Sequence, residues 1–167
     1  MKHWTLKGKT AIVTGASKGI GKATTEEFLA LGAEVLFLAR SEDLIREAEE
    51  DYQQKGYKAF GMVADIGEEK ERIAIVERAA SLWGKLDILV NNAGITGFLE
   101  APGPFDPEQS DLSTWDTVHR VNSTGTMLGC KYGIGLMKTS GGSIINISSR
   151  SGIVGIPGAV AYASSKA

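Results

Sequence analysis

The sequence predicts an α/β fold built on a doubly wound parallel sheet. Short runs rich in β-branched and aliphatic residues alternate with longer segments of helical periodicity, which is typical of repeated βαβ units. The runs predict five strands, at residues 10–14, 34–39, 58–64, 86–90 and 143–148. The longer segments predict helices at residues 20–31, 41–55, 67–83 and 113–138. We expect the strand order 3-2-1-4-5 and a single domain over residues 1–167.

Several predicted helices carry residues that favour helix ends. Glycine follows three of them, at Gly32, Gly56 and Gly84, where it adopts the left-handed cap conformation without a steric penalty. Ser113 and Asp116 have the spacing of a capping box, which predicts that Ser113 caps the last helix.

Composition excludes several classes of protein. The chain has 167 residues, of which 43% are hydrophobic and 23% charged, as in an ordinary globular domain. A net charge of -2 without blocks of like charge argues against a nucleic-acid partner. The single cysteine, Cys130, offers neither an internal disulfide nor a metal cluster. No run approaches the ~20 apolar residues of a membrane span, so we expect a cytoplasmic protein with a small-molecule partner.

A glycine-rich turn lies between the first predicted strand and the first predicted helix. Its spacing is G-x-x-x-G-x-G, beginning at Gly15. Glycine lets the chain turn tightly and lets a pyrophosphate approach the backbone, while the N–H groups and dipole of the helix favour an anion. The turn predicts a Rossmann-type dinucleotide-binding fold, with cofactor-binding residues Gly15, Ser17, Lys18, Gly19, Ile20 and Gly21.

The end of the second predicted strand favours NADP(H) over NAD(H). Folds that bind NAD usually place an acid there for the ribose 2′-hydroxyl, whereas this chain has Arg40. The guanidinium of Arg40 suits a 2′-phosphate, and Lys18 could add a second positive charge. The alternative is that both residues are solvated surface cations.

Tyr162 and Lys166 are four residues apart, so they share one face of a helix. They follow the last predicted strand, whose end carries Ser148 and Ser149. A tyrosine with an ordinary pKa near 10 shuttles protons poorly at neutral pH, and a nearby ammonium lowers that pKa. The pattern suggests proton transfer at a carbonyl oxygen that Ser149 could also hydrogen-bond.

Five motifs then occur in the order of one known family. They are the glycine turn, Asn91-Asn92-Ala93-Gly94, Asn122 in Val121-Asn122-Ser123-Thr124-Gly125, Ser149 in Asn146-Ile147-Ser148-Ser149, and Tyr162-Ala163-Ser164-Ser165-Lys166. From about residue 7 onward, the chain resembles the short-chain dehydrogenase/reductase family, in particular its tropinone-reductase-like and 3-oxoacyl-carrier-protein-reductase-like members. The resemblance implies an NADP(H)-dependent oxidoreductase that interconverts a secondary alcohol and a ketone.

The resemblance also implies a role for each matching residue. Tyr162 would be the general acid/base, and Lys166 would bind the nicotinamide ribose and lower the pKa of Tyr162. Ser149 would orient the substrate oxygen, and Asn122 would hold a water molecule that relays protons. Cofactor contacts would come from Asp65 at the adenine ring and from Asn91, Ala93 and Gly94 after the fourth strand. Without the resemblance, Asp65 and Asn91 are strand-end turn residues.

The chain departs from the family pattern after Lys166, where family members continue with further strands and helices. We therefore expect the family's last strands to be absent and the fifth strand to form an unpaired sheet edge. A non-catalytic nucleotide-binding or self-associating module, and less favourably a flavodoxin-like domain, remain alternatives to the reductase.

Two segments of the sequence leave alternatives open. Glycines in the 113–138 helix suit either a homo-oligomer contact or packing on the sheet. Residues 96–110, with three of the four prolines, form either a surface connection or a lip beside a cleft.

Overall fold

The computed structural model describes residues 4–97, 108 and 110–167. In this part of the chain, five parallel strands form one sheet in the order β3-β2-β1-β4-β5, which confirms the predicted order. The strands are β1 (Thr10–Thr14), β2 (Glu34–Ala39), β3 (Ala59–Val63), β4 (Ile88–Asn91) and β5 (Ser143–Asn146). The fold is therefore the Rossmann-type α/β arrangement.

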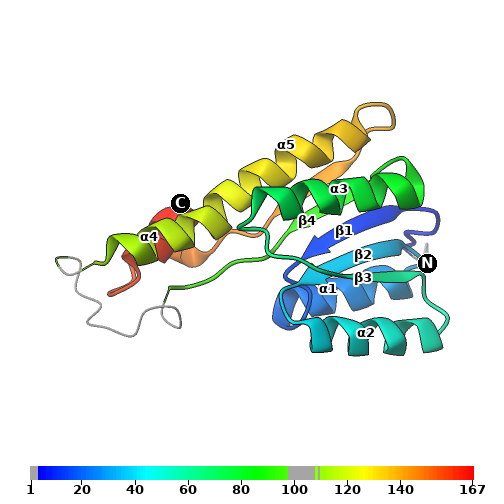
Figure 1. The fold of residues 1–167 in the computed structure, drawn as a ribbon, viewed down its shortest axis with the longest axis horizontal. Coiled ribbons are helices and arrows are strands. Elements are labelled where there is room, and N and C mark those ends of the chain that lie inside the picture. Colours follow the sequence, from blue (N-terminus) through cyan, green and yellow to red (C-terminus); the bar gives the residue numbers. More distant parts are fainter. Residues whose placement is uncertain (1–3, 98–107, 109) are drawn as a thin grey trace.

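Helices cover both faces of the sheet (Figure 1). One face carries α1 (Gly19–Ala30) and α2 (Glu42–Gln54), and the other carries α3 (Glu69–Trp83) and α5 (Thr126–Met137). Alternate residues of β1 supply the two cores, since Ala11 and Val13 pack on the first face and Ile12 on the second. Strands buried on both faces explain the continuous apolar runs in the sequence.

The predicted 113–138 helix is divided into three parts. It consists of α4 (Leu112–His119), a π-helix over Arg120–Gly125, and α5, which together form a rod that extends past the sheet (Figure 1). A short C-terminal helix, α6 (Val160–Lys166), packs against α4.

The predicted cap of that helix is wrong by two residues. Asp111 is the N-cap, and its carboxylate accepts a hydrogen bond of 2.9 Å from the Thr114 backbone N–H. Hydrogen bonds from the Ser113 hydroxyl and from Thr114 lower the pKa of Asp111 to about 2. A carboxylate satisfies the first-turn donors, so Ser113 lies inside the helix instead of capping it.

The glycines behave as two different groups. Gly32, Gly56 and Gly84 have φ values of +91°, +79° and +65°, as expected for left-handed helix ends. Gly125, Gly129 and Gly133 face the sheet, so the packing alternative holds for them. No helix among the described residues is both long and apolar enough to cross a membrane. Most of the 96–110 segment lies outside the described residues.

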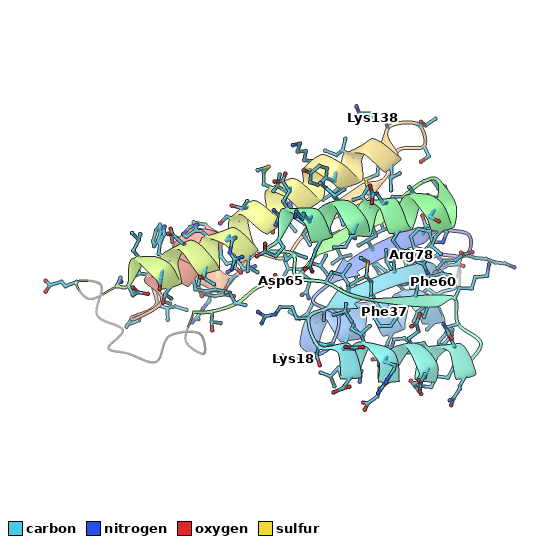
Figure 2. All side chains as sticks on the ribbon, viewed as in Figure 1. Lys18, Phe37, Phe60, Asp65, Arg78 and Lys138 are labelled. Atoms are coloured by element: carbon cyan, nitrogen blue, oxygen red, sulfur yellow. The ribbon has the colours of Figure 1, made fainter. Side chains whose placement is uncertain are left out.

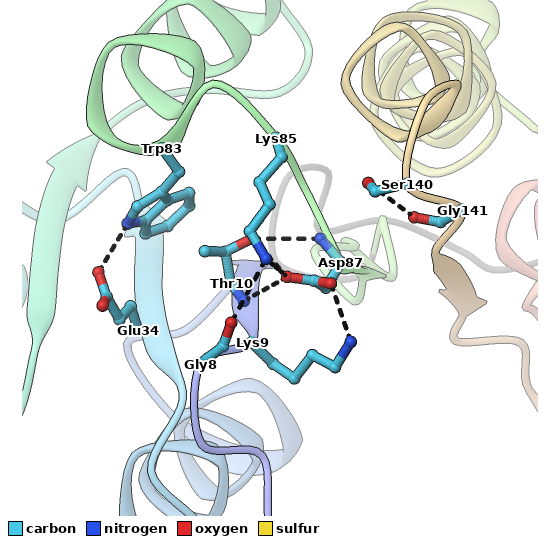
Figure 3. A network of polar contacts seen from close by, with 9 residues as sticks. All are labelled: Gly8, Lys9, Thr10, Glu34, Trp83, Lys85, Asp87, Ser140 and Gly141. Atoms are coloured by element: carbon cyan, nitrogen blue, oxygen red, sulfur yellow. Dashed lines mark hydrogen bonds and ion pairs between the residues drawn. The ribbon is translucent and has the colours of Figure 1, made fainter.

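A polar network joins the strands at the amino end of the sheet (Figure 3). The buried carboxylate of Asp87 accepts hydrogen bonds from Lys85 (2.8 Å), Lys9 (3.1 Å) and Thr10 (3.0 Å from its N–H). Burial by itself raises the pKa of Asp87. The hydrogen bonds from these donors lower the pKa by a larger amount, so it lies well below its ordinary value. The network ties the start of β1 to the segment that enters β4.

Candidate functional site

A cleft of about 460 Å³ opens at the carboxyl ends of the strands, where parallel sheets bind ligands. It lies at the end of the sheet opposite the Asp87 network. Most of the residues that the sequence assigns to cofactor binding line this cleft: Gly15, Ser17, Lys18, Ile20, Arg40, Asp65, Ala93 and Gly94. Figure 2 shows Lys18 and Asp65 at this same end of the molecule, although they follow different strands.

The glycine turn leaves no room for a side chain at two of its positions. Gly15 has a φ of +67°, and a Cβ added there would lie 2.7 Å from the Cα of Ala93. A Cβ on Gly21 would lie 2.3 Å from the carbonyl oxygen of Gly15, and Gly19 has a φ of +57°. The spacing therefore marks backbone requirements, and the turn keeps an open surface toward the cleft.

Asn92 holds this turn in place, which the sequence reasoning missed. Its Nδ2 donates to the carbonyl oxygens of Thr14 (2.9 Å) and Gly15 (3.1 Å). The Thr14 hydroxyl in turn accepts hydrogen bonds from the N–H groups of Asn92 (3.0 Å) and Ala93 (2.9 Å). The Asn91–Gly94 motif was the available signal, but only the long-range pairing identifies which asparagine supports the turn.

Helix α1 begins directly at the cleft with no cap from a side chain. Lys18 is its N-cap residue and makes no side-chain capping hydrogen bond. The first N–H groups of a helix have no partner within the helix, and the helix dipole makes this end positive. The turn and the helix start together fit a pyrophosphate group.

Two cations stand at the rim of the cleft. Arg40 and Lys18 are exposed and line it, and neither forms an ion pair with any residue in the described ranges. The nearest acids in sequence, Glu42 and Asp43, begin α2, and Asp43 lies 3.8 Å from Arg46. The cleft rim is therefore positively charged on the β2 side.

Asp65 lines the cleft, whereas Asn91 does not. The Oδ1 of Asp65 accepts a hydrogen bond of 2.7 Å from the N–H of Gly67. The Asn91 side chain instead donates to Asn146 Oδ1 (2.9 Å) and lines a small cavity beneath α5. Any cofactor contact of Asn91 would therefore not come from this buried side chain.

Asn122 and Lys166 meet at the edge of the cleft beside Gly94. Asn122 is buried in the π-helix, where its side chain pairs with the N–H and carbonyl of Ile95 (both 2.9 Å) and with Ser165 Oγ (2.9 Å). A Cβ on Gly94 would lie 3.2 Å from Asn122 Oδ1 and 3.4 Å from Lys166 Nζ. Burial lowers the pKa of Lys166, whose Nζ donates to the carbonyl of Ile147 (2.8 Å).

Ser149 and Tyr162 are less closely integrated. Ser149 Oγ accepts a hydrogen bond from the N–H of Ser151 (3.1 Å), and α6, which carries Tyr162, packs against this turn. Within the described part of the chain, no hydrogen bond joins the Tyr162 hydroxyl to Ser149 or Lys166. The structure thus brings Asn122 and Lys166 together, and Ser165 Oγ links Asn122 to the backbone carbonyl of Tyr162 (2.8 Å), while among the described residues the hydroxyls of Tyr162 and Ser149 make no hydrogen bond to Asn122 or Lys166.

The π-helix and His119 position α6. Neither was predicted from the sequence. His119 Nε2 lies 3.0 Å from Ser164 Oγ on α6, and its Nδ1 lies 3.1 Å from Ser123 Oγ. A π-turn adds one residue to a helical turn and occurs often at functional sites. Periodicity over 113–138 could not reveal it.

Known proteins are similar to this chain in sequence and in fold. The sequence profile described as short chain dehydrogenase matches residues 9–167. A tropinone reductase homolog from Datura stramonium is 36% identical over 167 residues, covering 99% of this chain and 60% of that protein. Glucose 1-dehydrogenase 2 from Bacillus subtilis (strain 168) is 39% identical over 164 residues, covering 96% of this chain and 62% of that protein.

A solved structure agrees with these relatives. A crystal structure from Sinorhizobium meliloti 1021, assigned as a short-chain alcohol dehydrogenase, matches with a TM-score of 0.87 and 32% identity. The match covers 98% of this chain and 63% of that one. The chain therefore spans roughly three fifths of the length of these relatives.

Proposed function

The chain belongs to the short-chain dehydrogenase family, and on this premise we propose that it supplies the nucleotide-binding site of an NADP(H)-dependent oxidoreductase. The reaction is the interconversion of a secondary alcohol and a ketone. The observation that carries the proposal is the cleft, because the glycine turn, Arg40 and Asp65 line one continuous surface. Residues 1–167 act as one binding unit in this proposal.

Different residues of the cleft bind different parts of the cofactor. Ser17, Gly19, Ile20 and Gly21 receive the pyrophosphate at the start of α1, where Gly15 lets it approach the backbone. Arg40 and Lys18 hold the 2′-phosphate, and the absence of an ion-pair partner for either among the described residues supports this role. Asp65 contacts the adenine ring, and the backbone of residues 91–94 lies along the cofactor.

The remaining residues act on the substrate. When bound, the nicotinamide supplies or accepts the hydride. Tyr162 donates a proton to the carbonyl oxygen, or takes it from the alcohol, and Ser149 hydrogen-bonds the same oxygen. Lys166 favours the phenolate of Tyr162, and Asn122 holds a water on the route of the proton to Lys166.

The cofactor proposal is tested on the 167-residue chain by calorimetric titration with NADPH, NADP and NAD. We expect NADPH to bind more tightly than NAD. Arg40→Asp should weaken NADP binding by about 100-fold, the value of two charge-assisted hydrogen bonds, without weakening NAD binding. Arg46→Asp is the matched control, because Arg46 is exposed on α2 and does not line the cleft. Failure of the wild type to bind any of these nucleotides contradicts the proposal.

The catalytic proposal is tested on the protein purified from its natural source. NADPH oxidation is followed with a panel of ketones that includes sugars, steroids and small cyclic ketones. Tyr162→Phe should reduce kcat by about 10³-fold while the Kd for NADPH changes little. Tyr132→Phe is the control, since the Tyr132 hydroxyl donates to Glu69 (2.8 Å) away from the cleft. Retained turnover in Tyr162→Phe would remove Tyr162 from this role.

A further inference from the structure

Arg72 is a buried arginine without a carboxylate partner. It lies in the first turns of α3 and is 6% exposed. Its Nη1 donates to the carbonyl oxygen of Ile66, its Nε has no partner, and it forms no ion pair in the part of the chain that the structure describes. Burying a charged group in this way is unfavourable unless the contacts it makes are needed.

The acids nearest to Arg72 in sequence are all committed elsewhere. Glu68 pairs with Arg120, Glu69 accepts from the Tyr132 hydroxyl, and Glu71 accepts from the backbone N–H of Asp65. The guanidinium is therefore directed at a backbone carbonyl although three carboxylates stand next to it in the chain.

The carbonyl that Arg72 holds belongs to the wall of the nucleotide cleft. Asp65 and Ile66 both line the cleft, and Ile66 also lines the cavity of about 20 Å³ that Arg72 borders on the other side. Two side chains of α3 hold this segment by hydrogen bonds: Arg72 holds the carbonyl of Ile66 and Glu71 the N–H of Asp65. Gly125 makes room here, since a Cβ there would lie 3.1 Å from the Ile66 carbonyl oxygen.

We infer that Arg72 is a positioning residue that fixes the Asp65–Ile66 wall for the adenosine part of the nucleotide, an inference that rests on the proposed function. Arg72 does not line the cleft and touches no ligand itself. Its hydrogen bond sets the position of a wall that the adenine ring would contact. A buried charge whose desolvation is unfavourable would thereby be retained for binding.

The test compares Arg72→Met with Arg72→Lys and with the control Arg78→Met. Figure 2 places Arg78 on α3, well away from Asp65, and Arg78 is exposed. Three quantities are measured on the 167-residue chain: the Kd for 2′,5′-ADP by calorimetry, the Tm, and amide hydrogen exchange. We expect Arg72→Met to weaken 2′,5′-ADP binding by about tenfold and to speed exchange at residues 65–67. The Tm should not fall, because an unpaired buried charge is removed, and Arg72→Lys should recover most of the affinity.

The outcomes separate this inference from the proposed function. A wild type that does not bind 2′,5′-ADP contradicts the proposed function and the role of Arg72 together. Wild-type binding that Arg72→Met leaves unchanged overturns the inference alone. A lower Tm with faster exchange throughout the chain also overturns it, since Arg72 would then support the whole fold and not the cleft wall.

Discussion

Strands β1 and β5 belong to the same sheet but have very different surroundings. Every residue of β1 is buried, between β2 and β4 and beneath helices on both faces. Among the described residues, β5 pairs only with β4, and three of its four residues are exposed, including Ile145 at 42%. Both strands are rich in β-branched residues, so the neighbours of a strand decide its burial, and its own composition does not.

This difference divides the candidate site into two halves. The glycine turn and Arg40 follow β1 and β2, whose core-facing residues are buried, and Asp65 follows β3, which is buried or half-buried except at Val63. Ser149, Tyr162 and Lys166 follow β5 at the exposed edge. A binding site is held best by rigid elements, so we expect the nucleotide half of the cleft to be better ordered than the half around Tyr162.

The largest loss of stability should come from removing a large side chain at the centre of the sheet. Phe37 in β2 is fully buried and contacts Tyr52 edge to face, with ring centroids 5.4 Å apart. Phe37→Ala should lower the free energy of unfolding by about 4 kcal/mol, measured by urea denaturation. Ile145→Ala in β5 is the comparison and should cost less than about 1 kcal/mol. Equal losses would show that the two strands do not differ as their burial indicates.

A slightly smaller loss of stability should come from disrupting the Asp87 network, which lies at the start of β1, away from the cleft. Its carboxylate is buried and accepts hydrogen bonds from two lysines and Thr10. Asp87→Asn should lower the free energy of unfolding at neutral pH by about 3 kcal/mol. Asp51→Asn is the control, because Asp51 and its partner Lys55 are exposed.

The pH dependence of Asp87→Asn has a definite sign. The pKa of Asp87 is lower in the folded chain than its ordinary value, so its stabilisation is present above about pH 4 and is lost as the pH falls further. The variant and the wild type should therefore converge in acid. A difference that stayed constant down to the acid transition would contradict the role given to the carboxylate charge.

Burial explains which strands the sequence predicts well. Residues 10–14 and 34–39 match β1 and β2 at both ends, because buried strands read as uninterrupted apolar runs. β5 is shorter than the predicted 143–148, since its ladder ends where Asn146 pairs with Asn91, the last residue of β4. The length of an edge strand depends on its partner, which a local pattern does not contain.

The site shows the same limit. Glycine spacing located the turn because backbone geometry requires glycine at Gly15 and Gly21. Asn92 and Arg72 were missed because each acts through a hydrogen bond to a backbone carbonyl, at a place that only the folded chain defines. A hydrogen bond from a side chain to a backbone carbonyl outside its own helix or strand leaves no periodic pattern in the sequence.

A smaller change in stability should come from glycine-to-alanine substitutions in α5, the helix that covers β4. A Cβ on Gly133 would lie 2.8 Å from Leu89 Cδ2, whereas one on Gly135 would meet nothing within 4 Å. Gly133→Ala should destabilise the chain by about 1 kcal/mol, since overpacking outweighs the gain in helix propensity. Gly135→Ala in the same helix should stabilise it by a similar amount. Thermal unfolding of the pair checks this, and stabilisation by both variants would mean that α5 moves freely away from β4.

The smallest change in stability should come from the edge itself, together with a change in association. Ile145 in β5 and Val63 in β3 lie on the two edge strands and are 42% and 47% exposed. Ile145→Lys should change the free energy of unfolding by less than about 0.5 kcal/mol, because the side chain already lies partly in water. An unpaired apolar edge favours pairing between chains, and a lysine opposes it.

Light scattering over a range of concentrations should therefore show self-association of the wild type that Ile145→Lys reduces. Val63→Lys is the matched control, because it places the same charge on the other edge. We expect it to reduce association less, since Ala59 in β3 is buried and Phe60, Gly61 and Met62 are half-buried, whereas β5 has three exposed residues of four. Equal effects of the two variants would show that both edges associate and that β5 is not the more open side of the sheet.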